Sequence, residues 1–398
     1  MTAAVDRVEP PPAIVLTFNS GSSSLKFGLF DVRGAQVDPL LTGEVETLGE
    51  GKARLHAADG VGTVLADQPI AATDHDATIG QIFSLLDRAA LPAPIVIGHR
   101  VVHGGPALLH HVLIDAAIMD QLERTSGFAP LHIPEALAMI RAARLHFPNL
   151  PQVACFDTSF HATMPPVAMT LPLPARLRDR GLRRYGFHGL SCESIVRQLG
   201  AELPERLVIA HLGNGASVTA VRAGQSVDTS MGLTPTGGIV MGTRTGDLDP
   251  GVLIHLLRER GYTAAMLETL VDHESGLLGL SGLGSDMRML NAAAATDPAA
   301  RLALDIFRHS LGKALASMVQ VLGGADMIVF TGGIGEHDAA LRAAIAQSLG
   351  WMGAAIDPTR NQAGAGRISA DASRLSLRVL VSQEDVEIAR HSAALMMD

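Results

Sequence analysis

Two arginines stand in polar, glycine-containing segments where a small anion could bind. Arg100 lies in GHRVVHGG (residues 98–105), and Arg244 lies in MGTRTGDLDP (residues 241–250). A guanidinium carries a fixed charge and forms paired hydrogen bonds with carboxylates and phosphates. An arginine can also stabilise the charge that spreads over a phosphoryl group during its transfer. A salt bridge at the end of a strand explains Arg100 equally well.

The same segment offers a second interpretation, a zinc site. His99 and His103 are four residues apart, which is the spacing of the two histidines in a zincin helix. That helix needs a glutamate after its first histidine, and Arg100 takes that place here. A cation in the centre disfavours a metal, so a metal-dependent hydrolase is a weakened alternative.

Three other polar residues follow apolar or glycine-rich stretches. Asp157 ends the apolar start of CFDTSFH, where a carboxylate could hold Mg²⁺ through water. His188 stands in YGFHG, whose glycines permit close approach of a substrate, and Glu384 stands in SQED just before the last expected helix. Taken singly, each has a simpler explanation: a turn aspartate, a structural histidine and an acid at a helix N-terminus.

Two similar strand–loop–strand patterns would position such residues. In the first half, a β-branched run at residues 14–18 precedes the Asn, Gly and Ser loop of residues 19–24. In the second half, residues 206–210 precede the loop HLGNGAS at residues 211–217. Backbone N–H groups in such loops can bind phosphate oxygens, although the spacing of a Walker A loop is absent. The repetition predicts a duplication with one phosphate-type hairpin in each half.

Helical patterns separate these hairpins. Residues 133–146 predict a helix with Pro134 in its first turn, and a longer helix is expected from about residue 300 to residue 322, ending before Gly323. The run MIVF at residues 327–330, a glycine-rich turn and a helix from Asp338 form the strand–turn–helix unit that often binds a nucleotide. The fold class is therefore predicted to be α/β, with a domain boundary near residue 150.

Composition excludes several classes of function. A chain of 398 residues favours two domains. Its net charge of −9 and its aromatic content of 4% give no basic surface or stacking platform for nucleic acid. No apolar run approaches the ~20 residues needed to span a membrane, and the N-terminus lacks a signal-peptide pattern. Cys155 and Cys192 are expected to be reduced, and the protein to be cytoplasmic.

The motifs together, in this order, resemble the acetate kinase family, within the sugar kinase, Hsp70 and actin fold group. The resemblance runs from Asn19 to Glu384 over NSGSSSLKF, GHRVVHGG, FDTSFH, RYGFHG, HLGNGAS, MGTRTGDLDP, SGLLGLSGLGSDMR and GGIGE. It implies two duplicated RNase H-like domains with an active-site cleft between them. The first would be residues 1–150, completed by the helix at 386–398, and the second would be residues 151–385, carrying the nucleotide pocket and a homodimer interface.

The resemblance also implies roles for individual residues. The metal, Mg²⁺ or Mn²⁺, would be held by Asn19 and Glu384, with Asp157 joining through the water shell. The catalytic residues would be Asp157, His188, Arg244 and Arg100. The acetate pocket would add His132, Val102, Leu131, Phe187 and Pro235. ATP or ADP would be bound by Lys26, Ser22, Ser24, His211, Leu212, Gly213, Asn214, Gly215, Asp286, Met287, Arg288, Gly333, Ile334, Gly335, Glu336 and His337.

The implied activity is reversible, Mg²⁺-dependent transfer of the ATP γ-phosphate to acetate, giving acetyl phosphate and ADP by direct in-line transfer. A carboxylate is already ionised at pH 7, so the nucleophile needs no general base. Propionate differs by one methylene, worth only about 1 kcal/mol, so propionate or butyrate kinase is an alternative. An ATP-driven binding protein like Hsp70 or actin is another alternative, although the chain leaves no room for a peptide-binding domain after Glu384.

Four residues depart from the common pattern of the family. Ile133 follows His132 where asparagine is usual, and Cys192 stands where histidine is common. His337 and Gln383 each replace a usual asparagine. Because His337 would lie beside the adenine, this change is expected to bear on nucleotide preference, and Ile133 on the shape of the acetate pocket.

Overall fold

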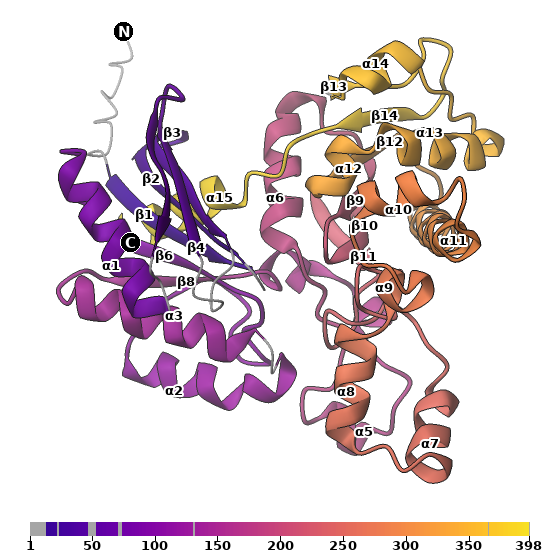
Figure 1. Cartoon of the computed structure of the whole chain (residues 1–398), viewed down its shortest axis with the longest axis horizontal. Helices are drawn as coiled ribbons and strands as arrows, with labels where there is room; N and C mark the ends of the chain where they lie inside the picture. Colours follow the sequence, from indigo (N-terminus) through magenta and orange to yellow (C-terminus); the bar gives the residue numbers. More distant parts are fainter. Residues whose placement is uncertain are drawn as a thin grey trace, which may run out of the picture. The chain divides into compact units, whose positions relative to one another are not determined.

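The computed structural model describes residues 13–21, 24–46, 53–70, 74–129, 132–364 and 366–397. Contacts divide the chain into two compact units, one of Met1–Ser159 with Gln383–Asp398 and one of Phe160–Ser382 (Figure 1). The boundary therefore follows Ser159 and not residue 150 as expected. The reason is that the strand β8 (Gln152–Phe156) pairs in parallel with β6 (Val96–Val101) of the first unit.

The first unit contains a sheet with the strand order β5-β4-β3-β2-β1-β6-β8-β7. The predicted hairpin is confirmed as β1 and β2, which pair antiparallel with Asn19 opposite Lys26. β1 pairs with β6 in parallel. The bounds of the remaining strands are β1 (Ala13–Ser20), β2 (Ser24–Arg33), β3 (Gln36–Glu46), β4 (Ala53–Asp59), β5 (Val64–Ile70) and β7 (Val112–Leu113).

Helices cover both faces of this sheet. Alternate side chains of a strand point to opposite faces, and on β6 Ile97 packs into the core that α1 (His75–Arg88) and α3 (Ile133–His146) form with the sheet. Its neighbour Gly98 faces α15 (Glu384–Met397), where a Cβ atom would lie 2.5 Å from Ile388 Cγ2. The glycine therefore lets α15 lie directly on the strand. A smaller helix, α2 (Ala116–Arg124), packs against α3.

The second unit repeats the strand arrangement of the first. Its sheet has the order β11-β10-β9-β12-β14-β13. In both units three antiparallel strands (β3-β2-β1 and β11-β10-β9) continue into two parallel ones (β6-β8 and β12-β14). The α/β class and the duplicated hairpin are thereby confirmed. The bounds are β9 (Arg206–Leu212), β10 (Ala216–Arg222), β11 (Gln225–Thr229), β12 (Met327–Thr331), β13 (Gly366–Arg367) and β14 (Ser376–Val379).

Most helices of the second unit follow the predicted pattern. α11 (Pro298–Leu322) begins after Asp297, whose side chain accepts hydrogen bonds from two backbone N–H groups, and ends at Gly323 in the left-handed region. The glycine-rich segment expected as a turn is instead a short helix, α12 (Gly332–His337). Gly332, with φ 76°, turns the chain from β12 into this helix, and α13 (Ala339–Ser348) follows.

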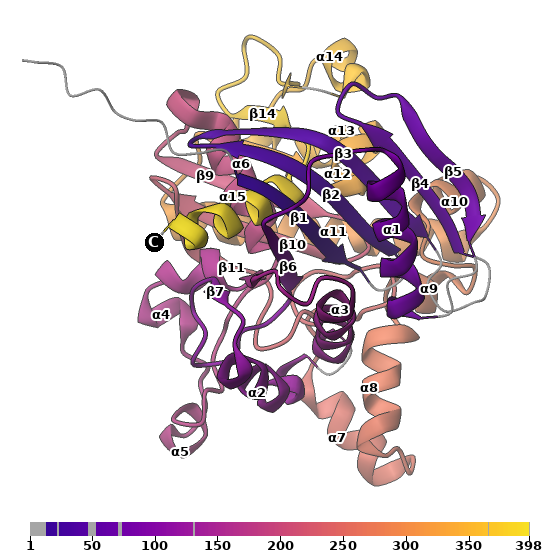
Figure 2. The same cartoon turned by 90° about the vertical axis from the view of Figure 1, so that its left-hand side faces the viewer.

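Two helices of the second unit extend away from its sheet, α7 (Pro250–Glu259) and α8 (Ala264–His273) (Figure 2). Neither helix has a buried residue. The unit also contains α4 (Pro166–Met169), α5 (Ala175–Arg178), α6 (Gly189–Leu199), α9 (Gly276–Ser281), α10 (Met287–Ala293) and α14 (Pro358–Ala363). Among the described parts of both units, none of the helices has the length and apolar character of a membrane span.

Candidate active site

The sheet of the first unit brings three predicted site residues together. Asn19 lies near the end of β1, Arg100 near the end of β6, and Asp157 directly after β8. These three strands are parallel neighbours, so their carboxyl ends share one edge of the sheet, where ligands of α/β proteins usually bind. Arg100 Nε donates to Asp157 Oδ1 (3.1 Å) and Oδ2 (3.0 Å), and its Nη2 donates to Oδ2 (2.6 Å).

Asn19 connects this ion pair to the C-terminal helix. Its Oδ1 accepts a hydrogen bond from Arg100 Nη1 (3.2 Å), and its Nδ2 donates to Glu384 Oε2 (3.0 Å). Glu384 is the first residue of α15, and its Oε2 lies 4.0 Å from Arg100 Nε. The predicted metal ligands Asn19 and Glu384 are therefore direct neighbours, although more than 360 residues separate them in sequence.

Burial and charge act against each other in this cluster. Burial tends to lower the pKa of Arg100, but the carboxylates of Asp157 and Glu384 more than offset it, so the pKa is raised. Burial raises the pKa of the Asp157 carboxyl, and the ion pair with Arg100 limits the rise. A guanidinium stays charged in proteins, so Arg100 opposes the effect of burial on the paired carboxylate.

The cluster contains one carboxylate that sequence reasoning missed, Asp385. Burial raises its pKa to about 6, with Glu384 adding to the rise and Lys26, Asn19 and Arg100 opposing it. Its Oδ1 is buried and has no hydrogen-bond partner among the described residues. Two consecutive acids, Glu384 and Asp385, open the last helix, and the sequence pattern predicts a ligand role for Glu384 alone.

The other predicted residues of the first unit lie on the β1–β2 hairpin and near α3. Lys26 is exposed and lies opposite Asn19 in the β1–β2 pairing. The Ser24 carbonyl accepts a hydrogen bond from the Gly21 backbone N–H (2.8 Å), which holds the two ends of the turn together. His132 precedes α3 at its N-terminus, and Val102 is buried. The predicted residues Ser22 and Leu131 lie outside the described residues.

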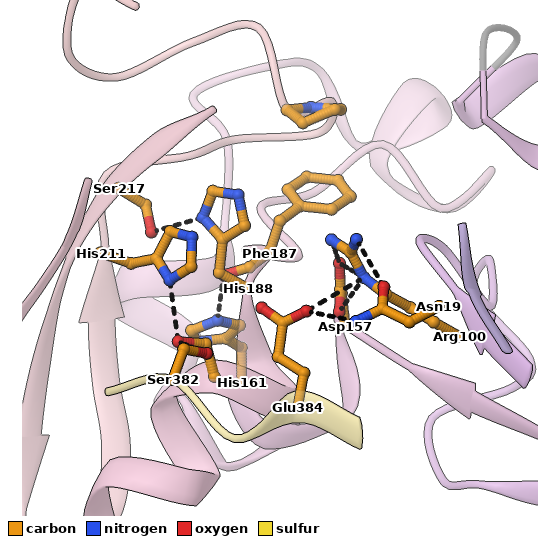
Figure 3. Close-up of polar contacts among 12 residues, drawn as sticks. Asn19, Arg100, Asp157, His161, Phe187, His188, His211, Ser217, Ser382 and Glu384 are labelled. Carbon is orange, nitrogen blue, oxygen red and sulfur yellow. Dashed lines mark hydrogen bonds and ion pairs between the residues drawn. The ribbon is translucent and has the colours of Figure 1, made fainter. Parts of the chain in front are cut away.

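In the second unit, His188 has a left-handed backbone conformation, and hydrogen bonds fix its ring and the peptide before it. Its backbone has φ 59° and ψ 29°, the left-handed region, directly before α6. Its Nδ1 hydrogen-bonds with Ser217 Oγ (3.0 Å), and its ring stacks on His211 with centroids 4.2 Å apart (Figure 3). Buried His161 hydrogen-bonds through Nε2 with the Phe187 carbonyl (2.9 Å), which fixes the preceding peptide.

Gly215 lies where His188 and Arg244 converge. A Cβ atom on Gly215 would lie 3.2 Å from His188 Nε2 and 3.3 Å from Arg244 Nη1. The same Nη1 donates to the Pro235 carbonyl (3.3 Å), so this guanidinium is held against the buried proline. The loop HLGNGAS, an imidazole and a guanidinium therefore meet at one point of the second unit, which suits an anion.

The side chain of Glu336 binds backbone N–H groups at the start of the glycine-rich helix α12 and beside it. Its Oε1 accepts hydrogen bonds from Gly332 N (2.9 Å) and Ser382 N (3.0 Å). Glu336 is a predicted nucleotide ligand, and in the structure its carboxylate binds the backbone of Gly332 and Ser382. Beneath it, Arg342 is only 1% exposed and donates to the carbonyls of Gly335 (2.8 Å) and Glu336 (2.9 Å). Nothing in the sequence around Arg342 indicated this role.

The remaining predicted nucleotide residues lie at α10. Asp286 precedes the helix and accepts a hydrogen bond from the backbone N–H of Arg288 (2.8 Å). Hydrogen bonds from the Arg288 side chain and backbone lower the pKa of Asp286 to about 2. Arg288 is largely exposed, whereas Met287 is buried.

The two histidines with zincin-like spacing, His99 and His103, each form a hydrogen bond within the first unit. Buried His99 hydrogen-bonds through Nε2 with the Gln152 side chain (2.8 Å), and burial lowers its pKa to about 4. His103 Nδ1 accepts a hydrogen bond from Gly105 N (2.7 Å). Cys192, at a position where histidine is common in the resembled family, is buried, and its Sγ donates to Thr219 Oγ1 (3.8 Å).

Comparison with known proteins identifies the family of the chain. A model of the acetokinase family matches residues 14–390. The acetate kinase of Nitrobacter hamburgensis is 41% identical over 392 residues, covering 96% of each chain, and that of Chromobacterium violaceum is 44% identical over 396 residues, covering 96% of this chain and 98% of the relative.

Solved structures agree with the sequence matches. A propionate kinase from Francisella tularensis matches with a TM-score of 0.89 and 34% identity, covering 96% of this chain and 100% of the other. An acetate kinase from Porphyromonas gingivalis matches with a TM-score of 0.84 and 33% identity, at the same coverage. The expectation from the motifs is confirmed, and the chain belongs to the acetokinase family.

Proposed function

We propose that this protein is an acetate kinase, which reversibly transfers the γ-phosphate of ATP to acetate and gives acetyl phosphate and ADP. The observation that carries the proposal is the convergence of His188 Nε2 and Arg244 Nη1 on Gly215 of the phosphate-type hairpin. Two donors, one of them permanently charged, at a backbone turn suit a phosphoryl group. The relatives named acetate kinase support acetate as the acceptor.

The main requirement of the proposed reaction is that two anions, the acetate carboxylate and the γ-phosphate of ATP, are brought together. The acetate carboxylate is ionised at neutral pH and attacks without a general base, so direct in-line transfer is the simplest route. We assign Arg100 to the carboxylate, and Arg244 and His188 to the charge that develops on the transferring phosphoryl group. Because Arg100 engages both oxygens of Asp157, we assign Asp157 to the orientation of this guanidinium and not to proton transfer.

The oxygen atoms beside Arg100 fit a divalent cation. The side chains of Asn19 and Glu384 are neighbours, and the buried Oδ1 of Asp385 has no hydrogen-bond partner among the described residues. Mg²⁺ prefers such oxygen ligands, and Mn²⁺ shares this preference. We propose that Asn19 and Glu384 hold the ion, which would supply positive charge to the phosphate oxygens of ATP.

The nucleotide is assigned to residues of both hairpins and of α10 and α12. The turn closed by Gly213 N and Gly215 O (3.0 Å) presents backbone N–H groups for the phosphates. We propose the adenosine contacts at residues 286–288 and 333–337, with Lys26 and Ser24 facing the phosphates. The exposed position of His337 is consistent with a contact to the base and with an altered nucleotide preference.

The choice between acetate and propionate is expected to depend on the apolar residues assigned to the methyl group. Phe187 and Pro235 are buried in the second unit, and Val102 is buried in the first. One additional methylene changes the free energy of binding by only about 1 kcal/mol, and a propionate kinase is among the structural matches. We propose acetate as the preferred acid and propionate as the second candidate.

We further propose that the protein is a homodimer through α7 and α8. These helices bury none of their own residues, and large apolar side chains on and beside them are 41–48% exposed: Leu248, Val252, Ile254, Leu257 and Met266. Large exposed apolar patches usually mark a protein interface. A second copy of the chain would cover them with the same surface, as in a twofold dimer.

The activity is tested by trapping acyl phosphate with hydroxylamine. Reactions contain ATP, Mg²⁺ and either acetate, propionate or butyrate, and the hydroxamate is measured by its iron complex. We expect product that requires both enzyme and Mg²⁺, falls at least about 1000-fold in Arg244→Ala, and is unchanged in Arg360→Ala, where an arginine paired with Asp371 is lost. ATP hydrolysis without hydroxamate from any acid would instead support an ATP-driven binding protein.

A further inference from the structure

A line of hydrogen bonds runs behind His211 in the second unit. Ser382 Oγ donates to Ser191 Oγ (2.9 Å), and Ser191 Oγ hydrogen-bonds with His211 Nδ1 (2.8 Å). Figure 3 shows Ser382 beneath His211, whose ring stacks on His188. None of the roles assigned above involves Ser191 or Ser382.

Both hydroxyls are fixed by the surrounding structure. Ser191 belongs to the first turn of α6 and is 0% exposed. Ser382 is held through its backbone, because its N–H donates to Glu336 Oε1 (3.0 Å), the same oxygen that accepts from Gly332 N (2.9 Å). The line therefore begins at the glycine-rich helix α12 and ends at the imidazole of His211.

The line of hydrogen bonds bears on where the His211 ring carries its proton. A hydroxyl has a single proton to donate. Ser191 Oγ accepts from Ser382 with one lone pair, and its own proton can be donated to His211 Nδ1. A neutral imidazole that accepts at Nδ1 carries its proton at Nε2. Nε2 faces the loop of residues 213–215, since a Cβ atom on Gly213 would lie 3.8 Å from it.

We propose that Ser191 and Ser382 are positioning residues that hold His211 in its Nε2–H form, as a hydrogen-bond donor to a phosphate oxygen of ATP. This inference rests on the proposed function only for the identity of the ligand. The donor form suits the loop, because a phosphate presents acceptor oxygens only. It also leaves the His211 ring neutral against His188, whose Nδ1 is engaged by Ser217 (3.0 Å).

The first test observes the proton directly and needs no substrate. Uniformly ¹⁵N-labelled full-length protein is studied at pH 8 by two-dimensional NMR of the histidine rings, and the His211 signals are assigned by their loss in His211→Gln. We expect the Nε2–H form in the wild type and a mixture of both tautomers in Ser191→Ala. A wild-type ring protonated at Nδ1, or no change in Ser191→Ala, would overturn the proposal.

The second test measures nucleotide kinetics in the same variants. The KM for ATP is expected to rise about fivefold to tenfold in Ser191→Ala, as for the loss of one hydrogen bond, and less in Ser382→Ala, with kcat and the KM for acetate nearly unchanged. Ser194→Ala is the matched control, because this buried serine of the same helix donates to the Ser191 carbonyl (2.8 Å). Equal effects in Ser194→Ala and Ser191→Ala would indicate a structural role only and overturn the proposal.

A double variant separates positioning from independent effects. If Ser191 acts through His211, adding Ser191→Ala to His211→Gln should not raise the KM for ATP further. Additive increases would contradict the proposal. Absence of acetyl phosphate formation in the wild type would remove the proposed function, yet the NMR result would still report the tautomer, so the two failures are distinguishable.

Discussion

Arg100 holds the carboxylate of Asp157 by both oxygens, with its Nε 3.1 Å from Oδ1 and its Nη2 2.6 Å from Oδ2. The Asp157 side chain is 1% exposed and that of Arg100 is 15% exposed. Neighbouring strands supply the two residues, so the angle of the guanidinium is set by the register of β6 and β8. The remaining donor, Nη1, reaches Asn19, which leaves the orientation of the guanidinium little freedom.

Removal of Asp157 should therefore affect both stability and catalysis. In Asp157→Ala, buried Arg100 loses its closest carboxylate and keeps Asn19 and the more distant Glu384, and we expect the free energy of unfolding to fall by about 3 kcal/mol. We expect kcat to fall about 100-fold, because a misplaced positioning group commonly has that effect. Urea denaturation and the hydroxamate assay measure the two changes.

An apolar replacement of both residues separates charge from packing. Arg100→Met with Asp157→Leu removes both buried charges, so this double variant should be inactive yet more stable than Asp157→Ala. Asp67→Ala, which breaks the exposed pair with Arg54, should change stability by less than about 1 kcal/mol. A double variant that is less stable than Asp157→Ala would refute the assignment of an unpaired buried charge.

Gly215→Ala should impair the reaction with little effect on folding. The new methyl group would lie 3.2 Å from His188 Nε2 and 3.3 Å from Arg244 Nη1, and so would occupy the point where these donors meet an anion. We expect kcat/KM for ATP to fall by roughly 100-fold, the lower end of the range found when one donor to a developing charge is lost. The melting temperature should stay nearly constant. Gly127→Ala, a site with open space around it, is the control, and unchanged kinetics in Gly215→Ala would contradict the site.

Stability should decrease as the pH falls from about 6.5 toward 4. Burial lowers the pKa of both His99 and His161 to about 4, whereas an unfolded histidine titrates near 6.5. In that range the unfolded chain binds protons that the native protein does not, so each histidine removes about 1.4 kcal/mol of stability per pH unit. Urea unfolding at pH 7 and pH 5.5 measures the loss.

Substitution of one buried histidine should reduce that loss. His161→Gln cannot titrate, and we expect its stability difference between the two pH values to be smaller than that of the wild type by roughly 1 kcal/mol. His110→Gln, at an exposed position of the first unit, should leave the difference unchanged. The same pH dependence in His161→Gln and the wild type would show that the histidine is not neutral in the native protein.

The proposed dimer can be tested by light scattering after size-exclusion chromatography. For a chain of 41.6 kDa we expect the wild type at twice this mass. Ile254→Asp together with Leu257→Asp would place two charges on the apolar face of α7, and we expect a monomer. Leu145→Asp, at a side chain that is 72% exposed in the first unit, should remain dimeric. A wild-type protein that is monomeric in this experiment would contradict the proposed dimer through α7 and α8.

Local patterns in the sequence predicted the elements that carry the site. The two hairpins, α3 and α11 were predicted because apolar periodicity, glycines and prolines are local signals. Strands β3 to β5 were missed, since β3 contains Pro39, which normally argues against a strand. In the structure Pro39 pairs with Phe30, where the register between β2 and β3 shifts, and such irregularities tolerate a proline.

Contacts between residues that are distant in the chain could not be predicted from the sequence. Ser191 and Ser382 are 191 residues apart, and neither lies in a pattern typical of a hydrogen-bonded pair. Arg342 lies in an alanine-rich helix, where only the folded structure reveals that its guanidinium supports Gly335. Asp385 needed the burial of its side chain to distinguish it from an ordinary acid in the first turn of a helix.

The repeated strand order makes Asn19 and His211 equivalent positions of one ancestral hairpin. Asn19 faces Lys26 in the next-to-last pair of β1 and β2, and His211 faces Ser217 in the next-to-last pair of β9 and β10. One copy now carries an amide and an amine, and the other an imidazole and a hydroxyl. Under the proposed function, one hairpin would hold the cation and the other the phosphates, so two similar strand arrangements would bind different ligands.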